Sequence, residues 1–181
     1  MAGVYSAVSD GVLALVALLV AYRCLRNALQ APAAGFALIG TAALVGSMRY
    51  GGFTAVLPLH QLLSSWAGWS GLLLVALYGA HRRAVGILLV VGLGLAVLGL
   101  GGQIQLATNV LALAILIARA YRLRAQQFSS ALAGSFGFTV AGLVVGTQGS
   151  WGGMARLDLY HLMIALAVIS LYRSLPKKTA V

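Results

Sequence analysis

Seven apolar segments follow one another along the chain, with only short polar stretches between them. They cover residues 4–22, 33–48, 55–78, 85–101, 104–120, 129–146 and 157–171. Several are shorter than the roughly 20 residues that usually span a hydrocarbon core, but small Ala- and Gly-rich helices can cross a thin or locally thinned membrane. The pattern predicts an all-α fold, a seven-transmembrane-helix bundle that forms a single transmembrane domain over residues 1–181.

Charge placement bears on the number of spans, because only residues 101–103 separate the fourth and fifth segments and six helices are the alternative. With seven spans, one side receives Arg23, Arg26, Arg82, Arg83, Arg119, Arg122, Arg124, Arg173, Lys177 and Lys178, and the other receives Arg49 and Arg156. A merged fourth and fifth segment would destroy this asymmetry. Since Lys and Arg accumulate in cytoplasmic loops, we predict seven spans, with the N-terminus outside and the C-terminus in the cytoplasm.

Composition supports a membrane location. Of the 181 residues, 61% are hydrophobic and only 8% are charged, whereas a soluble domain carries roughly 25% charged residues. The net charge of +10 is spread between the apolar segments, so it sets topology rather than forming the basic surface that nucleic acid requires. The single cysteine, Cys24, excludes an intrachain disulfide. Because Asp10 interrupts the first apolar run, we interpret this segment as a retained helix and not as a signal peptide.

Polar residues within the apolar segments are the candidates for function, because burying them in a bilayer is costly. The predicted orientation places six of them within roughly 10 Å of the outer surface, at 1.5 Å rise per residue: Asp10, Ser47, Arg49, His60, Asp158 and His161. Asp158 and His161 share a helix face at i and i+3. Together with His60 they predict a zinc site with an open position for water.

A purely structural interpretation of the same layer is the alternative. Arg49 and Arg156 can neutralise the two aspartates near the interface, and His60 can cap its helix or bond a backbone carbonyl. His161 can hydrogen-bond Ser47 or Asp10 across helices.

Two stretches carry a resemblance to a known family. Residues 157–173 begin with Asp-x-x-His and end in Tyr-Arg, and residues 36–53 end in Ser-Met-Arg-Tyr-Gly-Gly before Phe. Both are similar to an uncharacterised family of small bacterial seven-helix membrane proteins. That family remotely resembles the alkaline ceramidase and adiponectin-receptor superfamily of intramembrane metal-dependent hydrolases.

The resemblance implies a bacterial cytoplasmic (inner) membrane location and a zinc ion held by histidines that cleaves a lipid amide. Ser47 matches the serine of the second helix, and His161 matches the first histidine of the last. The superfamily's second histidine, four residues on, is replaced here by Ala165, and its second-helix histidine has no counterpart. His60 can substitute only if the third helix turns it inward.

Three functions are therefore expected from the sequence. The first is a metal-dependent hydrolase of lipid-like amides or esters, with zinc on His60, His161 and Asp158, Ser47 nearby, and Asp10 or Asp158 as general base. The second is a non-enzymatic membrane protein that binds a small ligand or joins a larger complex. The third is a haem protein with His60 and His161 as axial ligands. The expected partners are membrane lipid, a lipid-like substrate, and a protein partner or a second copy of the chain.

Overall fold

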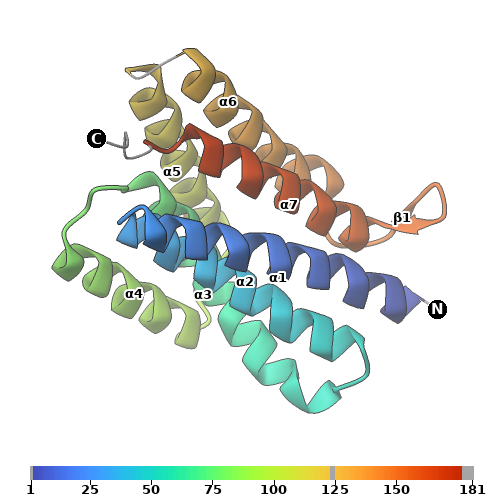
Figure 1. Ribbon diagram of the computed structural model, residues 1–181. Coiled ribbons are helices and arrows are strands. Elements are labelled where there is room, and N and C mark those ends of the chain that lie inside the picture. Colours follow the sequence, from blue (N-terminus) through green and yellow to red (C-terminus); the bar gives the residue numbers. More distant parts are fainter. Residues whose placement is uncertain (1, 123–124, 177–181) are drawn as a thin grey trace.

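The computed structural model describes residues 2–122 and 125–176 and forms a bundle of helices (Figure 1). Seven α-helices make up most of it: α1 Ala2–Arg26, α2 Gln30–Tyr50, α3 Leu57–Ala76, α4 Arg82–Val97, α5 Gln103–Tyr121, α6 Ala125–Val140 and α7 Arg156–Ser174. Each predicted apolar segment corresponds to one of these helices, so the predicted helical fold is confirmed. Three residues used in the charge comparison, Arg124, Lys177 and Lys178, lie outside the described residues.

Within the described residues, five helices are long and apolar enough to cross a membrane. They comprise residues Gly3–Arg26, Gln30–Tyr50, Gln103–Tyr121, Gln126–Val145 and Arg156–Ser174. Helix α1, with 25 residues, extends about 37 Å at 1.5 Å per residue, more than the roughly 30 Å of a hydrocarbon core. Helix α4 has 16 residues, and α3 begins with a polar stretch around His60 and Gln61.

Six of the helices form a closed ring. Each helix contacts the next in the order α1, α2, α3, α5, α6 and α7, and α7 contacts α1 to close the ring. Helix α4 lies outside this six-helix ring against α3, and Figure 1 shows it at the edge of the bundle. Within α4 only Gly92 and Ala96 are buried. The six-helix ring therefore encloses the polar residues of α1, α2, α3 and α7.

Small side chains bring the helices of the ring close together. Ala14 and Ala17 of α1, Ala33 of α2 and Ala165 of α7 are buried in one apolar cluster. In a bilayer, close backbone approach and dispersion contacts stabilise helix pairs, because lipid removes the usual hydrophobic drive between them. The composition of these segments therefore determines a tightly packed bundle.

Three short elements interrupt the helical pattern. A 3₁₀ turn, η1 Thr54–Val56, precedes α3, and a π-helical turn, η2 Ala141–Val145, extends α6. Strands β1 Ser150–Trp151 and β2 Met154–Ala155 form an antiparallel hairpin before α7, with Trp151 opposite Met154. Its two turn residues, Gly152 and Gly153, have φ angles of +55° and +84°, which suit a two-residue turn that strongly prefers glycine.

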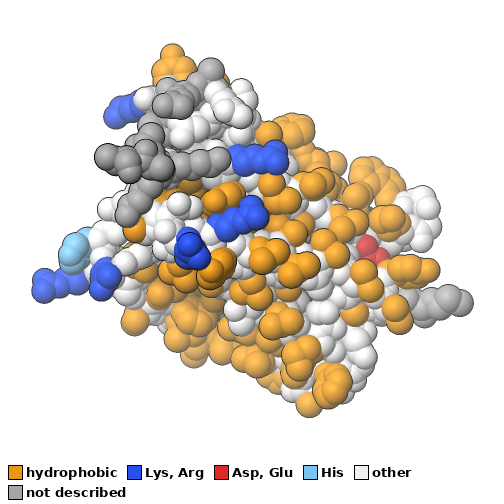
Figure 2. Space-filling model, viewed as in Figure 1, with side chains coloured by type: hydrophobic (Ala, Val, Ile, Leu, Met, Phe, Trp, Pro, Cys, Tyr) orange, Lys and Arg blue, Asp and Glu red, His pale blue; other side chains and the backbone are white. Residues whose placement is uncertain are grey.

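The chain's two ends lie at opposite ends of the bundle. In Figure 1 the N-terminus and the hairpin lie at one end, and the C-terminus lies at the other. The Lys and Arg side chains visible in Figure 2 gather on the half of the face that carries the C-terminus. The basic side chains visible on this face thus lie away from the N-terminus and the hairpin.

Candidate functional site

A continuous chain of hydrogen bonds joins α1 to α7 near the hairpin end of the bundle. Ser6 Oγ donates to Asp158 Oδ1 at 2.7 Å, and Ser9 Oγ lies 3.3 Å from the same oxygen. Ser9 Oγ also lies 3.3 Å from His161 Nδ1, and His161 Nε2 lies 3.2 Å from Asp10 Oδ1. All five residues are buried. The two aspartates are therefore linked through a histidine and a serine.

Helical spacing explains this arrangement. Ser6, Ser9 and Asp10 stand at i, i+3 and i+4 on α1, and Asp158 and His161 stand at i and i+3 on α7, so each set lies on one helix face. Because α1 and α7 are neighbours in the six-helix ring, the two polar faces meet. The predicted shared face of Asp158 and His161 is thus observed, and the bond from His161 to Asp10 confirms one of the structural alternatives.

The second carboxylate oxygen of Asp10 is buried without a hydrogen-bond partner among the described residues. It lies beside Gly46 of α2, and a methyl group at position 46 would overlap it. The same methyl group would lie 2.8 Å from His60 Nε2. Only glycine at this position therefore lets Asp10 and His60 approach each other, although no hydrogen bond or ion pair joins them in the described structure.

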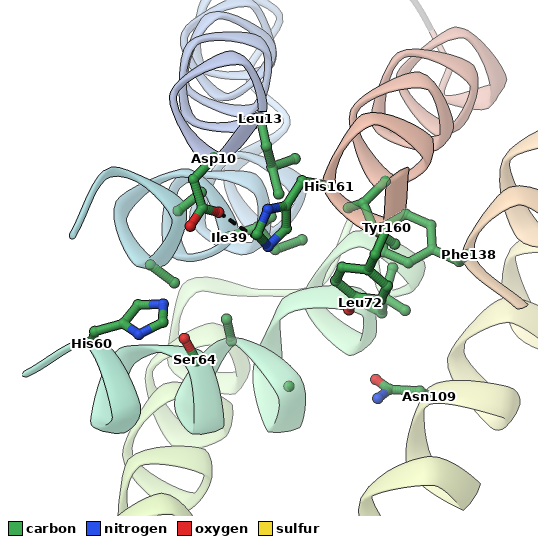
Figure 3. Close-up of a pocket in the computed structure, with 15 residues that line it drawn as sticks. Asp10, Leu13, Ile39, His60, Ser64, Leu72, Asn109, Phe138, Tyr160 and His161 are labelled. Carbon is green, nitrogen blue, oxygen red and sulfur yellow. Dashed lines mark ion pairs between the residues drawn. The ribbon is translucent and has the colours of Figure 1, made fainter. Parts of the chain in front are cut away.

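These groups line a cavity of about 180 Å³ inside the six-helix ring. Figure 3 shows Asp10 and His161 joined across α1 and α7, with the His60 imidazole directed toward them from α3. Every helix of the ring contributes to the lining, whose polar members are Asp10, His60, Ser64, Asn109, Tyr160 and His161. The remaining lining is apolar. We call this space the central cavity.

Neither aspartate has a lysine or arginine partner in the part of the chain that the structure describes. Arg49 lies 3.0 Å from His60 Nδ1, with its guanidinium 4.9 Å from the centre of the Tyr50 ring. Arg156 donates to the carbonyl of Val144, where it caps the end of η2. Neither arginine therefore forms an ion pair with an aspartate in the described structure, although the charge of Arg49 acts on Asp10 at longer range.

The chemistry of the donors does not fit the predicted zinc site. No group of three His, Cys, Asp or Glu side chains in residues 2–122 and 125–176 is placed to hold a metal ion. Both imidazole nitrogens of His161 have hydrogen-bond partners. Arg49 can only donate, so His60 Nδ1 accepts and its Nε2 carries the proton. Asp158 lies on the far side of His161 and accepts hydrogen bonds from serines of α1.

The remaining predicted residue, Ser47, lies apart from the hydrogen-bond chain. Its hydroxyl donates to the carbonyl of Ala7 at 2.7 Å and so ties α2 to α1. Ser6, Ser9 and Gly46 are not among the site residues predicted from the sequence. Ser6 and Ser9 could have been predicted, because they stand at i and i+3 and Asp10 follows at i+4 on the same helix face. The role of Gly46 could not, because it depends on how α1, α2 and α3 meet.

Comparisons with known proteins add no assignment. No protein-family model, no curated protein and no solved structure matches this chain.

Proposed function

We propose that this chain is an integral membrane protein that binds a small organic cation, such as a protonated amine, in the central cavity. The observation that carries the proposal is the unpartnered oxygen of Asp10. Asp10 is only 2% exposed, and its carboxylate forms no ion pair with a lysine or arginine among the described residues. Leaving such an acceptor unsatisfied costs about 1–3 kcal/mol, more when it is charged.

A ligand with N–H donors removes this cost. An ammonium group beside Asp10 donates to the free Oδ2 and places a positive charge next to the carboxylate. Ser64 and Asn109 line the same cavity and offer hydrogen bonds to any second polar group on the ligand. Arg49 does not line the cavity, and its guanidinium faces His60 from the Nδ1 side.

Cavity size limits the ligand. An engineered cavity of about 150 Å³ holds one benzene molecule, so about 180 Å³ suits a compound of roughly that size. The proposal includes the predicted membrane topology, with seven spans, the N-terminus outside and the C-terminus in the cytoplasm. The central cavity then lies toward the outer half of the membrane, because Asp10 and His161 lie in the first turns after the outer ends of α1 and α7.

Benzylamine is a suitable probe, with benzyl alcohol, benzoate and toluene as matched compounds of similar size. We expect calorimetry on detergent-purified protein to show binding of benzylamine and no binding of benzoate or toluene. Asp10→Asn removes the carboxylate charge with little change in shape. It should weaken benzylamine binding about ten- to hundredfold, since a hydrogen bond to a charged group contributes about 1.5–3 kcal/mol.

Asp158→Asn is the matched control, because Asp158 is the chain's other acid and does not line the central cavity. It should leave benzylamine binding within about twofold of wild type, well below the tenfold that 1.4 kcal/mol represents. Equal binding by wild type and Asp10→Asn, or binding of benzoate as tight as that of benzylamine, would refute the proposal.

The zinc-dependent hydrolase implied by the resemblance stays a prediction. The geometry supports it less well, because its three proposed ligands do not converge and Arg49 places a positive charge next to His60.

A further inference from the structure

A second cavity, of about 630 Å³, lies between α1, α7 and the hairpin. It is lined by Tyr5, Val8, Ser9 and Val12 of α1, by residues 152–155 of the hairpin, and by Asp158 and Leu162 of α7. We call it the membrane-facing groove. It shares no lining residue with the central cavity, and the inference below does not rest on the function proposed for that cavity.

The walls of the groove are apolar and exposed. Tyr5, Val8 and Met154 each expose half or more of their surface. Tyr5 and Val8 project from α1, which is apolar enough to cross a membrane, and Met154 belongs to β2 of the hairpin. The groove therefore opens toward lipid and not toward the interior of the bundle. Its walls suit the alkyl chains of a membrane lipid.

The floor of the groove is polar. Ser9 and Asp158 lie there, and Asp158 is only 6% exposed. Figure 2 shows a small acidic area at the surface, enclosed by hydrophobic side chains, on the half of this face away from the Lys and Arg side chains. A carboxylate is therefore reachable from within an apolar surface.

Asp158 forms no ion pair with a lysine or arginine among the described residues. The hydrogen bonds that it accepts come from the neutral hydroxyls of Ser6 and Ser9, and Ser9 stands between it and the His161 ring. Arg156, two residues away on α7, is directed instead to the carbonyl of Val144 and to the Trp151 ring. A carboxylate in an apolar setting strongly favours a nearby cation, because water screens it poorly.

We propose that the membrane-facing groove binds a membrane lipid whose head group ends in a primary ammonium. The ammonium donates hydrogen bonds to Asp158, and the alkyl chains lie along Val8, Val12 and Leu162. A quaternary ammonium carries the same charge but has no N–H donor, so it satisfies Asp158 less well. The groove therefore distinguishes the two head groups.

Trp151 provides a reporter, because it precedes the groove-lining residues 152–155 and is 57% exposed. The full-length protein is placed in phosphatidylcholine vesicles in which a small fraction of the lipid is replaced by brominated phosphatidylethanolamine or by brominated phosphatidylcholine. Bromine quenches tryptophan fluorescence on contact. The quenching that disappears in Trp151→Phe belongs to Trp151 and not to Trp66 or Trp69.

We expect phosphatidylethanolamine to quench Trp151 with an apparent affinity about tenfold higher than that of phosphatidylcholine, a typical effect of one hydrogen bond to a charged group. Asp158→Asn should reduce this preference to about one. Asp10→Asn, which changes the other acid and leaves the groove intact, should keep it. The Cys24 thiol, buried in the folded protein, reports through its reactivity whether each variant is folded.

Three results would overturn the proposal. Equal quenching by both lipids in the wild type means that the groove does not recognise the ammonium, and a preference that survives in folded Asp158→Asn means that another group recognises it. Loss of the preference in Asp10→Asn as well as in Asp158→Asn would place the recognition in the shared hydrogen-bond chain and not in the groove. Each of these results is independent of benzylamine binding to the central cavity.

Discussion

Replacing Gly46 by alanine tests the geometry around Asp10 most directly. The added methyl group would overlap Asp10 Oδ2 and would lie 2.8 Å from His60 Nε2 and 3.0 Å from Asp10 Cγ. Asp10 belongs to α1 and His60 to α3, while Gly46 is buried on α2 between them. The new side chain therefore meets two neighbours at once, and the Asp10 carboxylate has to rotate away from His161.

The size of the effect follows from three contributions. Losing the bond between Asp10 and His161 costs about 1.5–3 kcal/mol if the pair is charged, and overpacking costs about 1–3 kcal/mol. Alanine in place of glycine within a helix returns about 1 kcal/mol. We expect Gly46→Ala to lower the free energy of unfolding by roughly 1.5–5 kcal/mol. At about 2–4 °C per kcal/mol for a protein of this size, the unfolding temperature falls by roughly 3–20 °C.

Cys24 supplies the assay. It is the only cysteine in the chain and it is buried, so a thiol-reactive maleimide dye reports unfolding as the temperature rises in detergent. Gly94→Ala is the matched control, since a methyl group at Gly94 of α4 would meet no atom within 4 Å. That variant should be unchanged or slightly more stable.

A double variant separates the clash from a general defect in α2. In an Asp10→Ala background the carboxylate is gone and only the contact with His60 Nε2 remains, so adding Gly46→Ala should destabilise the protein much less, and the two changes should be strongly non-additive. If Gly46→Ala alone is as stable as Gly94→Ala, then Asp10 and His60 do not meet at Gly46, and the central cavity as described is wrong.

Two further predictions concern topology and the hydrogen-bond chain. With Cys24 replaced by alanine, we expect Ser150→Cys to react with a membrane-impermeant maleimide applied to intact cells, and Arg122→Cys to react only after permeabilisation; the reverse result would invert the proposed orientation. Ser9→Ala leaves His161 Nδ1 without the partner that lies 3.3 Å away and should lower stability by about 1 kcal/mol, measured as a shift in thermal unfolding. An unchanged unfolding temperature would mean that Ser9 is not part of a buried network.

The hydrophobic pattern predicted the helices well, because the length and composition of a membrane-spanning segment follow directly from the bilayer. The segment predicted at 33–48 lies within α2 Gln30–Tyr50, and the segment at 157–171 lies within α7 Arg156–Ser174. The hairpin was missed, although its Gly152-Gly153 pair is a typical two-residue turn. It lies between two long apolar segments, where a short loop was expected.

The candidate site was predicted only in part. The costly polar residues of the apolar segments pointed to Asp10, Asp158 and His161, and spacing along α7 correctly put the last two on one face. Their partners depend on which helices are neighbours in space. A set of two histidines and an aspartate at similar depth suggested a metal site, but His60 and Asp158 lie on opposite sides of His161 and face different cavities.

By itself the sequence determined the helical, membrane-type fold and the helix boundaries to within a few residues. It also determined which polar residues lie at a similar depth along their helices. These depend on hydrophobicity and on rise per residue, which are local properties. Tertiary structure alone decided that six helices close into a ring with α4 outside it. It also decided that Gly46 opens space between Asp10 and His60, and that Asp158 lines the second cavity and not the central one. These features depend on which side chains approach one another across helices, and no local pattern encodes that contact.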